Sequence, residues 1–344
     1  MAKDTDVKSL PYSKSDFVSG QDVRWCPGCG DYSILATMQS TLAKNNFPKE
    51  NYAFISGIGC SSRFPYYMNT YGFHTIHGRA PTIATGLRAV NPDLSIWIIS
   101  GDGDGLSIGG NHLIHSMRRN MDINVIFVNN RIYGLTKGQF SPTSDFGQIT
   151  HTSPMGSISY PVNPLCIAIA SESTFIARTA DVMPMHMAHV FEEALKHKGS
   201  SFIEIYQNCR IFNNHAFDAI LAKENRDERT VLLENGKPLT FGKNKEKGIR
   251  MKGLNLEIVK LSEVNNEDEL LVHEENAKLP THAYLLTQMT YPEMPVPFGI
   301  FRTIEKPTYD HMLDDQVKKS IATNGKGKLK DLIYGSETWK VKRS

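Results

Sequence analysis

The sequence of 344 residues has no long hydrophobic run, no excess of charge of either sign and only five cysteines. Because no 18 consecutive residues are apolar, a membrane-spanning helix is not expected, and the polar N-terminus lacks the apolar segment of a secretory signal. The 38 basic residues nearly balance the 36 acidic ones, so charge gives no reason to expect nucleic acid or an anionic membrane as a partner. Internal repeats and low-complexity segments are also lacking. We therefore expect a soluble cytoplasmic protein with a sizeable core.

Short apolar runs alternate along the chain with segments of helical periodicity. The predicted strands are residues 53–58, 95–100, 124–129 and 201–207, and the predicted helices are residues 31–44, 82–90, 109–119 and 185–197. The two middle strands are rich in Ile and Val and carry apolar residues on both faces, as buried parallel strands require. This alternation predicts an α/β fold with a doubly wound, mostly parallel sheet and helices on both faces. Its ligand site is expected beyond the carboxyl ends of the strands.

The character of the sequence changes after about residue 220. Residues 223–229 are densely charged and residues 234–253 are rich in Gly, Lys and Asn, which we interpret as a linker or an exposed arm. Three prolines in residues 291–298 predict a sharp turn, and the tail from Lys318 is basic. We expect one domain over residues 1–220 and a C-terminal extension over residues 221–344 that contacts another subunit.

A Gly-Asp-Gly-Asp sequence at residues 101–104 directly follows a predicted strand. Glycine permits a tight turn with unusual dihedral angles, in which the backbone can approach a phosphate while Asp102 faces a cation. Asn130 stands 28 positions further on (130 − 102), at the end of the next strand, so its amide oxygen can reach the same ion. The backbone carbonyl of Ile132 is a third candidate ligand, and Mg²⁺ prefers such oxygen ligands. Two ordinary turns at strand ends are the alternative, but the combination favours a diphosphate site with Mg²⁺.

Four of the five cysteines form a pattern typical of one metal–sulfur site. Cys26 and Cys29 form a CxxC sequence, and Cys60 and Cys209 each lie just beyond a predicted strand. In a reducing cytosol such cysteines are more often metal ligands or redox groups than disulfides. They could hold an iron–sulfur cluster or a structural Zn²⁺. The lack of a second compact CxxC, and a neighbouring cofactor whose electrons need an acceptor, favour the cluster. Cys166 lies in an apolar segment and is interpreted as a core residue.

The order of these motifs is specific. CPGCG, GIGCSS, HGRA, GDGD, NN and YGLT follow one another, and a later strand leads to a cysteine and then IFN. Over residues 20–217 the chain resembles the β subunits of 2-oxoacid:ferredoxin oxidoreductases, especially those specific for 2-oxoglutarate, and residues 297–302 fit the same family. The resemblance implies thiamine diphosphate with Mg²⁺ at Asp102, Asn130 and Ile132. It also implies one [4Fe–4S] cluster, bound by Cys26, Cys29, Cys60 and Cys209.

The resemblance further implies a heterodimer, or a dimer of heterodimers, with an α subunit that brings the glutamate activating the aminopyrimidine. The implied reaction is the coenzyme A-dependent oxidative decarboxylation of 2-oxoglutarate to succinyl-CoA and CO₂, with electrons passing to ferredoxin. It can run in reverse as reductive carboxylation, as in a reductive tricarboxylic acid cycle. Three alternatives stay open: pyruvate or broad 2-oxoacid specificity, a non-redox thiamine decarboxylase subunit, and a zinc-stabilised regulatory subunit without chemistry.

Several residues beside these motifs are candidates for contacts with cofactor or substrate. Leu135 could wedge under the cofactor and hold its aminopyrimidine over the thiazolium, or simply fill the core. Lys137 and Arg63 could hold the carboxylates of a dicarboxylic substrate, or be surface charges. His77 could bond to the cofactor phosphate or the substrate, whereas His74 is interpreted as structural. The complete set of expected cofactor-binding residues is Cys60, Ser61, Ser62, His77, Gly101, Asp102, Gly103, Asp104, Asn130, Ile132, Gly134, Leu135 and Thr136.

Overall fold

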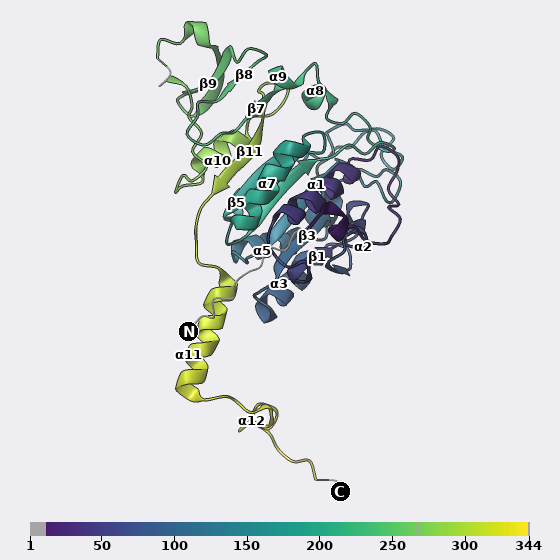
Figure 1. Cartoon of the computed structure of the whole chain (residues 1–344), viewed down its shortest axis with the longest axis vertical. Helices are drawn as coiled ribbons and strands as arrows, with labels where there is room; N and C mark the ends of the chain where they lie inside the picture. Colours follow the sequence, from purple (N-terminus) through teal and green to yellow (C-terminus); the bar gives the residue numbers. More distant parts are fainter. Residues whose placement is uncertain (1–11, 267–268, 343–344) are drawn as a thin grey trace.

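The computed structural model describes residues 12–266 and 269–342, so the first eleven residues of the polar N-terminus lie outside the described part. An eight-stranded sheet forms its centre (Figure 1). Its strand order is β2-β1-β3-β4-β6-β5-β11-β7. Neighbouring strands are parallel except for β11 beside β5. The predicted mostly parallel sheet is confirmed. Its strands are β1 Tyr52–Ser56, β2 Tyr71–His74, β3 Ser95–Gly101, β4 Asn124–Asn129, β5 Phe175–Ala180, β6 Ser201–Tyr206, β7 Thr230–Leu232 and β11 Val296–Thr303.

Helices cover both faces of the sheet, as predicted. One face packs against α1 Asp31–Lys44 and α7 Pro184–Lys196. The other face packs against α3 Ala80–Val90, α5 Gly110–Arg118, α6 Pro164–Ala170 and α10 Thr281–Thr287. Alternate residues of each strand contribute to the two hydrophobic cores, because successive side chains of a strand point to opposite faces of the sheet. Thus Trp97 and Ile99 pack with α1 and α7, whereas Ile98 packs on the other side.

The interpretation of residues 234–253 as a linker was wrong. These residues carry β8 Thr240–Phe241 and β9 Lys247–Lys252, which pair with β10 Asn255–Lys260 in a separate antiparallel sheet. Phe241 and Ile249 are buried, so a few apolar side chains stabilise a segment whose composition suggested exposure. The small sheet stands apart from the α/β body in Figure 1.

The segment after residue 220 also contributes to the main sheet. The parallel pair β7 and β11 forms one edge, and β11 starts at Val296, so the expected sharp turn over residues 291–298 ends earlier than predicted. The division of the chain at residue 220 stays a prediction. The remaining short helices are α2 Phe64–Tyr67, α4 Asp102–Leu106, α8 Asp218–Leu221 and α9 Arg226–Arg229, and 3₁₀ turns span Lys14–Phe17, Lys49–Asn51, Ser61–Arg63 and Leu261–Glu263.

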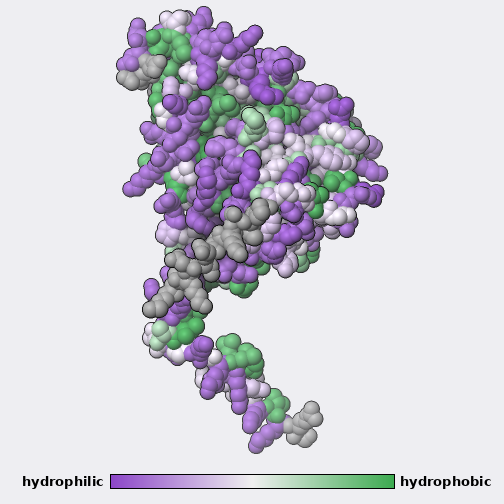
Figure 2. Space-filling model, viewed as in Figure 1, coloured by the Kyte–Doolittle hydropathy of each residue, from purple (hydrophilic) through white to green (hydrophobic). Residues whose placement is uncertain are grey.

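A C-terminal arm, which we define as residues 309–342 with α11 Tyr309–Asn324 and α12 Leu329–Ile333, projects from the body (Figure 1). Its root is held by Arg88, which donates to Asp310 Oδ2 at 2.8 Å and to Asp122 Oδ2 at 2.7 Å. Figure 2 shows hydrophobic residues along the projecting arm. Within residues 12–266 and 269–342, no helix combines the length and the apolar character needed to cross a membrane.

Candidate functional site

The loops that follow β1 and β3 meet at the carboxyl edge of the sheet. The chain pairs β1 first with β2 on one side and then with β3 on the other. Such a reversal creates a crevice in which α/β proteins bind ligands. The two loops are joined there, because the Ile58 N–H donates to Asp104 Oδ1 at 2.9 Å. A Cβ at Gly57 would lie 2.0 Å from Asp104 Oδ2, so only glycine permits this approach.

Asp104 organises this edge through a set of hydrogen bonds. Its Oδ1 also accepts from the Gly78 N–H at 2.7 Å and lies 2.9 Å from His77 Nδ1, while its Oδ2 accepts from Ser100 Oγ at 2.6 Å. Because these hydrogen bonds come from the loops after β1 and β2 and from the end of β3, Asp104 holds the loops together. The bond to His77 orients that imidazole through Nδ1. A contact of either residue with a cofactor stays a prediction.

The expectation of a tight turn with unusual dihedral angles at residues 101–104 was wrong. Asp102–Leu106 form the single-turn helix α4, and Gly101 precedes it with an ordinary φ of −77°. The glycines are needed for space instead. A Cβ at Gly103 would lie 2.3 Å from Tyr133 Cε1, whose ring packs against this turn. The Tyr133 hydroxyl donates to the Gly103 carbonyl at 2.9 Å and thereby ties the loop after β4 to the loop after β3.

Asp102 is buried at the same edge and receives two hydroxyl groups. Ser141 Oγ and Thr143 Oγ1 donate to its Oδ2 at 2.6 and 2.7 Å. Burial raises the pKa of Asp102, and these two hydrogen bonds partly counteract the effect. Both bonds end on one oxygen. Sequence reasoning missed Ser141 and Thr143 because they lie in a long loop without a recognisable motif.

The residues after β4 form a reversal around Arg131, which has a φ of +56°. Asn130 Oδ1 accepts from the Ile132 N–H at 3.2 Å, and Ile132 is buried. The preceding Asn129 is also buried, and its Oδ1 lies 2.9 Å from Thr143 Oγ1, so it competes with Asp102 Oδ2 for the single proton of that hydroxyl. The structure thus links the segment 129–132 to Asp102 through Thr143. Convergence of Asn130 and Ile132 on one cation with Asp102 stays a prediction.

The structure brings the segments of the four candidate cysteines together. Trp25 Nε1 donates to the Cys60 carbonyl at 2.7 Å, and the Gly30 N–H donates to the Asn208 carbonyl at 3.3 Å. A Cβ at Gly134 would lie 3.4 Å from Cys209 Sγ and 3.6 Å from Cys60 Sγ, so both sulfurs border the space beside Gly134. No group of three or more His, Cys, Asp or Glu side chains that could hold a metal ion occurs in the described part of the chain.

Three of these four thiols, those of Cys29, Cys60 and Cys209, are partly buried. Burial raises the pKa of Cys60 to about 12 and also raises the pKa values of Cys29 and Cys209, and the nearby Asp31 carboxylate acts in the same direction. Cys26 is exposed. Cys166 lies apart in α6, and its Sγ is 3.2 Å from Thr287 Oγ1. It is partly buried, not fully buried as expected.

A cavity of about 570 Å³ lies beside these loops. It brings together Arg63 and Leu135, two of the predicted substrate-site residues, with His74, which was interpreted as structural. Arg24 is a further cation in its wall that sequence reasoning missed, and its carbonyl accepts from Arg63 Nη1 at 2.8 Å. The other lining residues are Gly20, Gln21, Asp22, Ile58, Gly59, Tyr66 and Tyr67.

The remaining candidates are dispersed around this edge. Ser61 and Ser62 are buried in the 3₁₀ turn after Cys60, and Ser62 Oγ has no hydrogen-bond partner among the described residues. Thr136 is engaged with Gln139, whose Nε2 donates to the Thr136 carbonyl at 2.7 Å. Lys137 is exposed and is not one of the residues lining the cavity.

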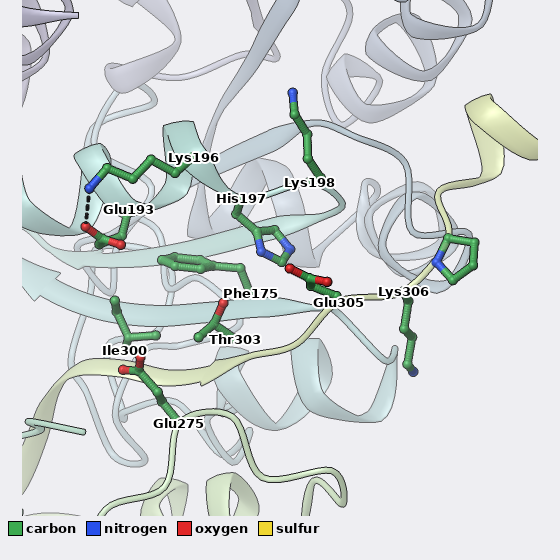
Figure 3. Close-up of a pocket in the computed structure, with 11 residues that line it drawn as sticks. Phe175, Glu193, Lys196, His197, Lys198, Glu275, Ile300, Thr303, Glu305 and Lys306 are labelled. Atoms are coloured by element: carbon green, nitrogen blue, oxygen red, sulfur yellow. Dashed lines mark hydrogen bonds and ion pairs between the residues drawn. The ribbon is translucent and has the colours of Figure 1, made fainter. Parts of the chain in front are cut away.

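Another cavity, of about 710 Å³, lies at the opposite edge of the sheet, where β5 begins at Phe175 (Figure 3). Lysine and glutamate side chains dominate its wall, and Lys196 pairs with Glu193 at 2.7 Å. α/β proteins bind ligands at the carboxyl ends of parallel strands. The position of this cavity at the other ends of the strands therefore does not favour a role in binding the cofactor or the substrate.

This fold and this site define the class: residues 57–205 match the family model of the C-terminal thiamine pyrophosphate-binding domain of thiamine pyrophosphate enzymes. The chain is also 47% identical over 334 residues to the 2-oxoglutarate oxidoreductase subunit KorB of Mycobacterium tuberculosis, covering 96% of this chain and 89% of that protein. It is 44% identical to the β subunit of 2-oxoacid:ferredoxin oxidoreductase 1 of Aeropyrum pernix, over 55% of this chain and 60% of that protein. The chain belongs to the family of β subunits of 2-oxoacid:ferredoxin oxidoreductases.

A solved structure agrees with this assignment. The 2-oxoglutarate:ferredoxin oxidoreductase from Magnetococcus marinus, with 2-oxoglutarate, coenzyme A and succinyl-CoA bound, matches with a TM-score of 0.74 and 28% identity. The match covers 96% of this chain and 98% of that chain. The likeness therefore includes the residues beyond the thiamine pyrophosphate-binding domain.

Proposed function

We propose that this chain is the β subunit of a 2-oxoglutarate:ferredoxin oxidoreductase that forms succinyl-CoA and CO₂ from 2-oxoglutarate and coenzyme A. The observation that carries the proposal is the junction of the loops after β1, β3 and β4 around buried Asp102, beside a cavity that contains Arg63 and Leu135. The similarity to a 2-oxoglutarate oxidoreductase subunit over 96% of the chain supports the substrate. The two electrons released pass to ferredoxin; in the reverse direction reduced ferredoxin would supply two electrons for the carboxylation of succinyl-CoA, with release of coenzyme A.

Thiamine diphosphate, when bound, supplies a carbon nucleophile and an electron sink for the 2-oxoacid. The residues proposed to hold its Mg²⁺ are Asp102, Asn130 and the carbonyl of Ile132. Asp102 fits this role for two reasons. Two hydroxyls at its Oδ2 orient the carboxylate. Burial raises its pKa, and a bound cation would stabilise the ionised form that burial disfavours. Carboxylate, amide and carbonyl oxygens are suitable ligands for Mg²⁺. His77, held by Asp104, is proposed to donate to the diphosphate or the substrate.

Cys26, Cys29, Cys60 and Cys209 are proposed to bind one [4Fe–4S] cluster that delivers electrons one at a time to a ferredoxin. Four thiols on three neighbouring loops suit such a cluster, and two of the sulfurs border the same space beside Gly134. A single structural Zn²⁺ fits less well, because the four cysteines lack a second compact CxxC and Zn²⁺ cannot accept the electrons of the neighbouring cofactor. Because the proposed ligands must remain reduced thiols, we propose a cytoplasmic enzyme.

The cavity is proposed to accept the 2-oxoacid. Arg63 supplies positive charge in its wall, where Arg24 is paired with Asp22 at 3.2 Å, and the half-exposed Leu135 supplies an apolar surface. A second carboxylate on the substrate would gain a charge-assisted hydrogen bond from such a cation. Ser61, Ser62, Gly134 and Thr136 flank the same loops and are proposed as further cofactor contacts.

An α subunit is the proposed partner that completes the site. Apolar residues stand exposed on the loop after β4, at the cofactor edge of the sheet, and Met155 and Ile158 are 95% and 87% exposed. A partner that covers this loop would exclude water from the reaction. The C-terminal arm is proposed as a second contact, because apolar side chains also stand exposed along it (Figure 2).

The experiment that tests the proposed function uses the chain purified anaerobically with its α subunit. Reduction of a viologen dye should require both 2-oxoglutarate and coenzyme A, and pyruvate should support a much lower kcat/KM. Equal kcat/KM values for several 2-oxoacids would favour the broad-specificity alternative. No reduction with any 2-oxoacid, in a complex that contains cofactor and iron, would overturn the proposal.

Lys137 does not line the cavity of this chain alone, so its proposed contact with the second carboxylate of 2-oxoglutarate belongs to the site completed by the α subunit. Lys137→Gly in that complex is expected to narrow the preference for 2-oxoglutarate over pyruvate about ten- to hundredfold, because a charge-assisted hydrogen bond contributes roughly 1.5–3 kcal/mol. Lys137 has a φ of +75°, which glycine adopts without strain, so the loss would report the side chain alone. Lys245→Gly is the matched control, since Lys245 is an exposed lysine with a φ of +53° in another part of the chain. The measurement is the ratio of the two kcat/KM values, and an unchanged ratio would return Lys137 to the solvated surface.

Replacing Leu332 and Ile333 together by Ser is expected to weaken association with the α subunit on the order of tenfold, as loss of apolar anchors at an interface does. These side chains of α12 are 83% and 56% exposed, so the thermal stability of the isolated chain should not change. Lys330→Ser on the same helix is the control. Titration calorimetry of the two subunits gives the Kd values, and equal values for the three proteins would exclude α12 from the interface.

A further inference from the structure

A continuous line of buried polar side chains crosses the sheet from β5 to Asp102. Arg178 Nε donates to Glu204 Oε2 at 2.7 Å, and Asn129 Nδ2 donates to Glu204 Oε1 at 2.7 Å. Asn129 Oδ1 lies 2.9 Å from Thr143 Oγ1, which in turn lies 2.7 Å from Asp102 Oδ2. All five residues are less than 5% exposed. Arg178 of β5, Glu204 of β6 and Asn129 of β4 are therefore linked to the proposed Mg²⁺ ligand Asp102 through Thr143.

Stability alone gives little reason for an ion pair in this place. Glu204 is fully buried in β6 between β4 and β5, and the Arg178 guanidinium lies over the rings of Tyr206 and Phe301 at 5.0 and 5.6 Å. Apolar residues of similar volume stabilise a core as well as, or better than, a buried ion pair. In the register of the sheet Glu204 stands between Phe127 of β4 and Arg178 of β5, and Phe127, Phe202 and Ile176 belong to the apolar core on this face. Its distinguishing feature is the hydrogen bond that Glu204 accepts from Asn129.

That hydrogen bond sets the orientation of the Asn129 amide. A carboxylate can only accept, so the amide nitrogen must face Glu204 and Oδ1 must face the other way. Asn129 Oδ1 then faces Thr143 Oγ1, whose single proton goes either to Asn129 Oδ1 or to Asp102 Oδ2, and it accepts from the Arg131 N–H at 3.3 Å. Arg131 is the middle residue of the reversal that presents Asn130 and Ile132. One amide thus contacts the neighbours of both groups of proposed Mg²⁺ ligands.

We propose that Glu204, held by Arg178, is a positioning residue that sets the Mg²⁺ site through Asn129 and Thr143. The carboxylate keeps the amide oxygen of Asn129 directed toward Thr143 and the Arg131 N–H. Asp102 is thereby kept with Oδ2 on hydroxyl donors, which leaves Oδ1 to the cation. The proposal rests on the proposed function of Asp102 as a Mg²⁺ ligand. Partners in the second layer of a metal site commonly change metal affinity tenfold to a hundredfold.

The test is Glu204→Gln in the complete enzyme with its α subunit. We expect the Mg²⁺ concentration for half-maximal thiamine diphosphate binding, followed by calorimetry, to rise at least about tenfold. Asp310→Asn is the matched control, because it also removes a buried carboxylate that pairs with an arginine, Arg88, but far from the site. The control should lower the melting temperature and leave the Mg²⁺ requirement unchanged. A Glu204→Gln enzyme that behaves like the control would show that the pair is only structural.

Two further variants separate the possible failures. If Glu204→Gln does not fold, Thr143→Val removes the hydroxyl that joins Asn129 to Asp102 without changing a strand, and it should raise the Mg²⁺ requirement likewise. An unchanged requirement in that variant would overturn the proposal. Asp102→Ala tests the function on which the proposal rests. Loss of Mg²⁺-dependent binding in Asp102→Ala but not in Glu204→Gln would reject only the positioning role, whereas retention in both would reject the Mg²⁺ assignment itself.

Discussion

Asp102→Ala is expected to abolish thiamine diphosphate binding and leave the fold intact. The substitution removes a proposed oxygen ligand of Mg²⁺, and the diphosphate then loses the cation that neutralises it. The fold should persist, because Asp102 is a buried carboxylate whose charge is disfavoured by its surroundings, and Ala is compatible with the short helix α4. Ser141 and Thr143 both lose Asp102 as an acceptor. Their hydroxyl oxygens lie 3.3 Å apart, so one hydroxyl can donate to the other. Cofactor content after gel filtration and the circular dichroism spectrum are the measurements.

Asn130→Ala should act in the same way for the same reason. Asp315→Ala is the control, because Asp315 is an exposed carboxylate on α11, remote from the cofactor edge. Wild-type cofactor content in Asp102→Ala would reject the assignment of the Gly-Asp-Gly-Asp motif to the Mg²⁺ and diphosphate site. An unfolded variant would instead mean that Asp102 supports the loops, as Asp104 does.

Cys209→Ala is expected to lose the cluster iron, and Cys166→Ala to keep it. Cys209 Sγ and Cys60 Sγ border the same space beside Gly134, whereas Cys166 lies in α6 against Thr287 and Gln288. Thiolates are the usual ligands of iron–sulfur clusters, and loss of one of four leaves an iron atom without its protein ligand. Cys166→Ala removes one partly buried sulfur and should have only a small packing effect. Iron and sulfide content and the broad absorption near 400 nm of anaerobic protein are the measurements.

Cys26→Ala, Cys29→Ala and Cys60→Ala should match Cys209→Ala. The reversed pattern, with iron lost from Cys166→Ala and kept in Cys209→Ala, would mean that Cys166 and not Cys209 is the fourth cluster ligand. Zinc in place of iron in protein purified without oxygen would instead favour the zinc-stabilised alternative.

Local patterns predicted the middle of the main sheet, β1, β3, β4 and β6, but not β2, β5, β7 or β11. The helix at residues 31–44 and the strand at residues 124–129 have the bounds predicted, because their apolar spacing alone matches a helix and a buried strand. The segment 234–253 was misjudged, since Phe241 and Ile249 are too few to show a period. The turn at residues 101–104 was misjudged because Gly was expected to supply dihedral angles, whereas Gly103 supplies room for Tyr133 thirty residues later.

The sequence by itself determined the class of fold, the family resemblance and the positions of the motifs, because each depends on residues that are neighbours in the chain. Only the tertiary structure decided what each motif residue touches. It showed that Asp104 joins three loops, that Asp102 receives hydroxyls from 39 and 41 residues away, and that Lys137 does not line the cavity beside Arg63. It also connected Arg178 and Glu204 to the site. The reason is physical: hydrogen bonds between distant segments depend on strand order and register, which leave no periodic trace in the sequence.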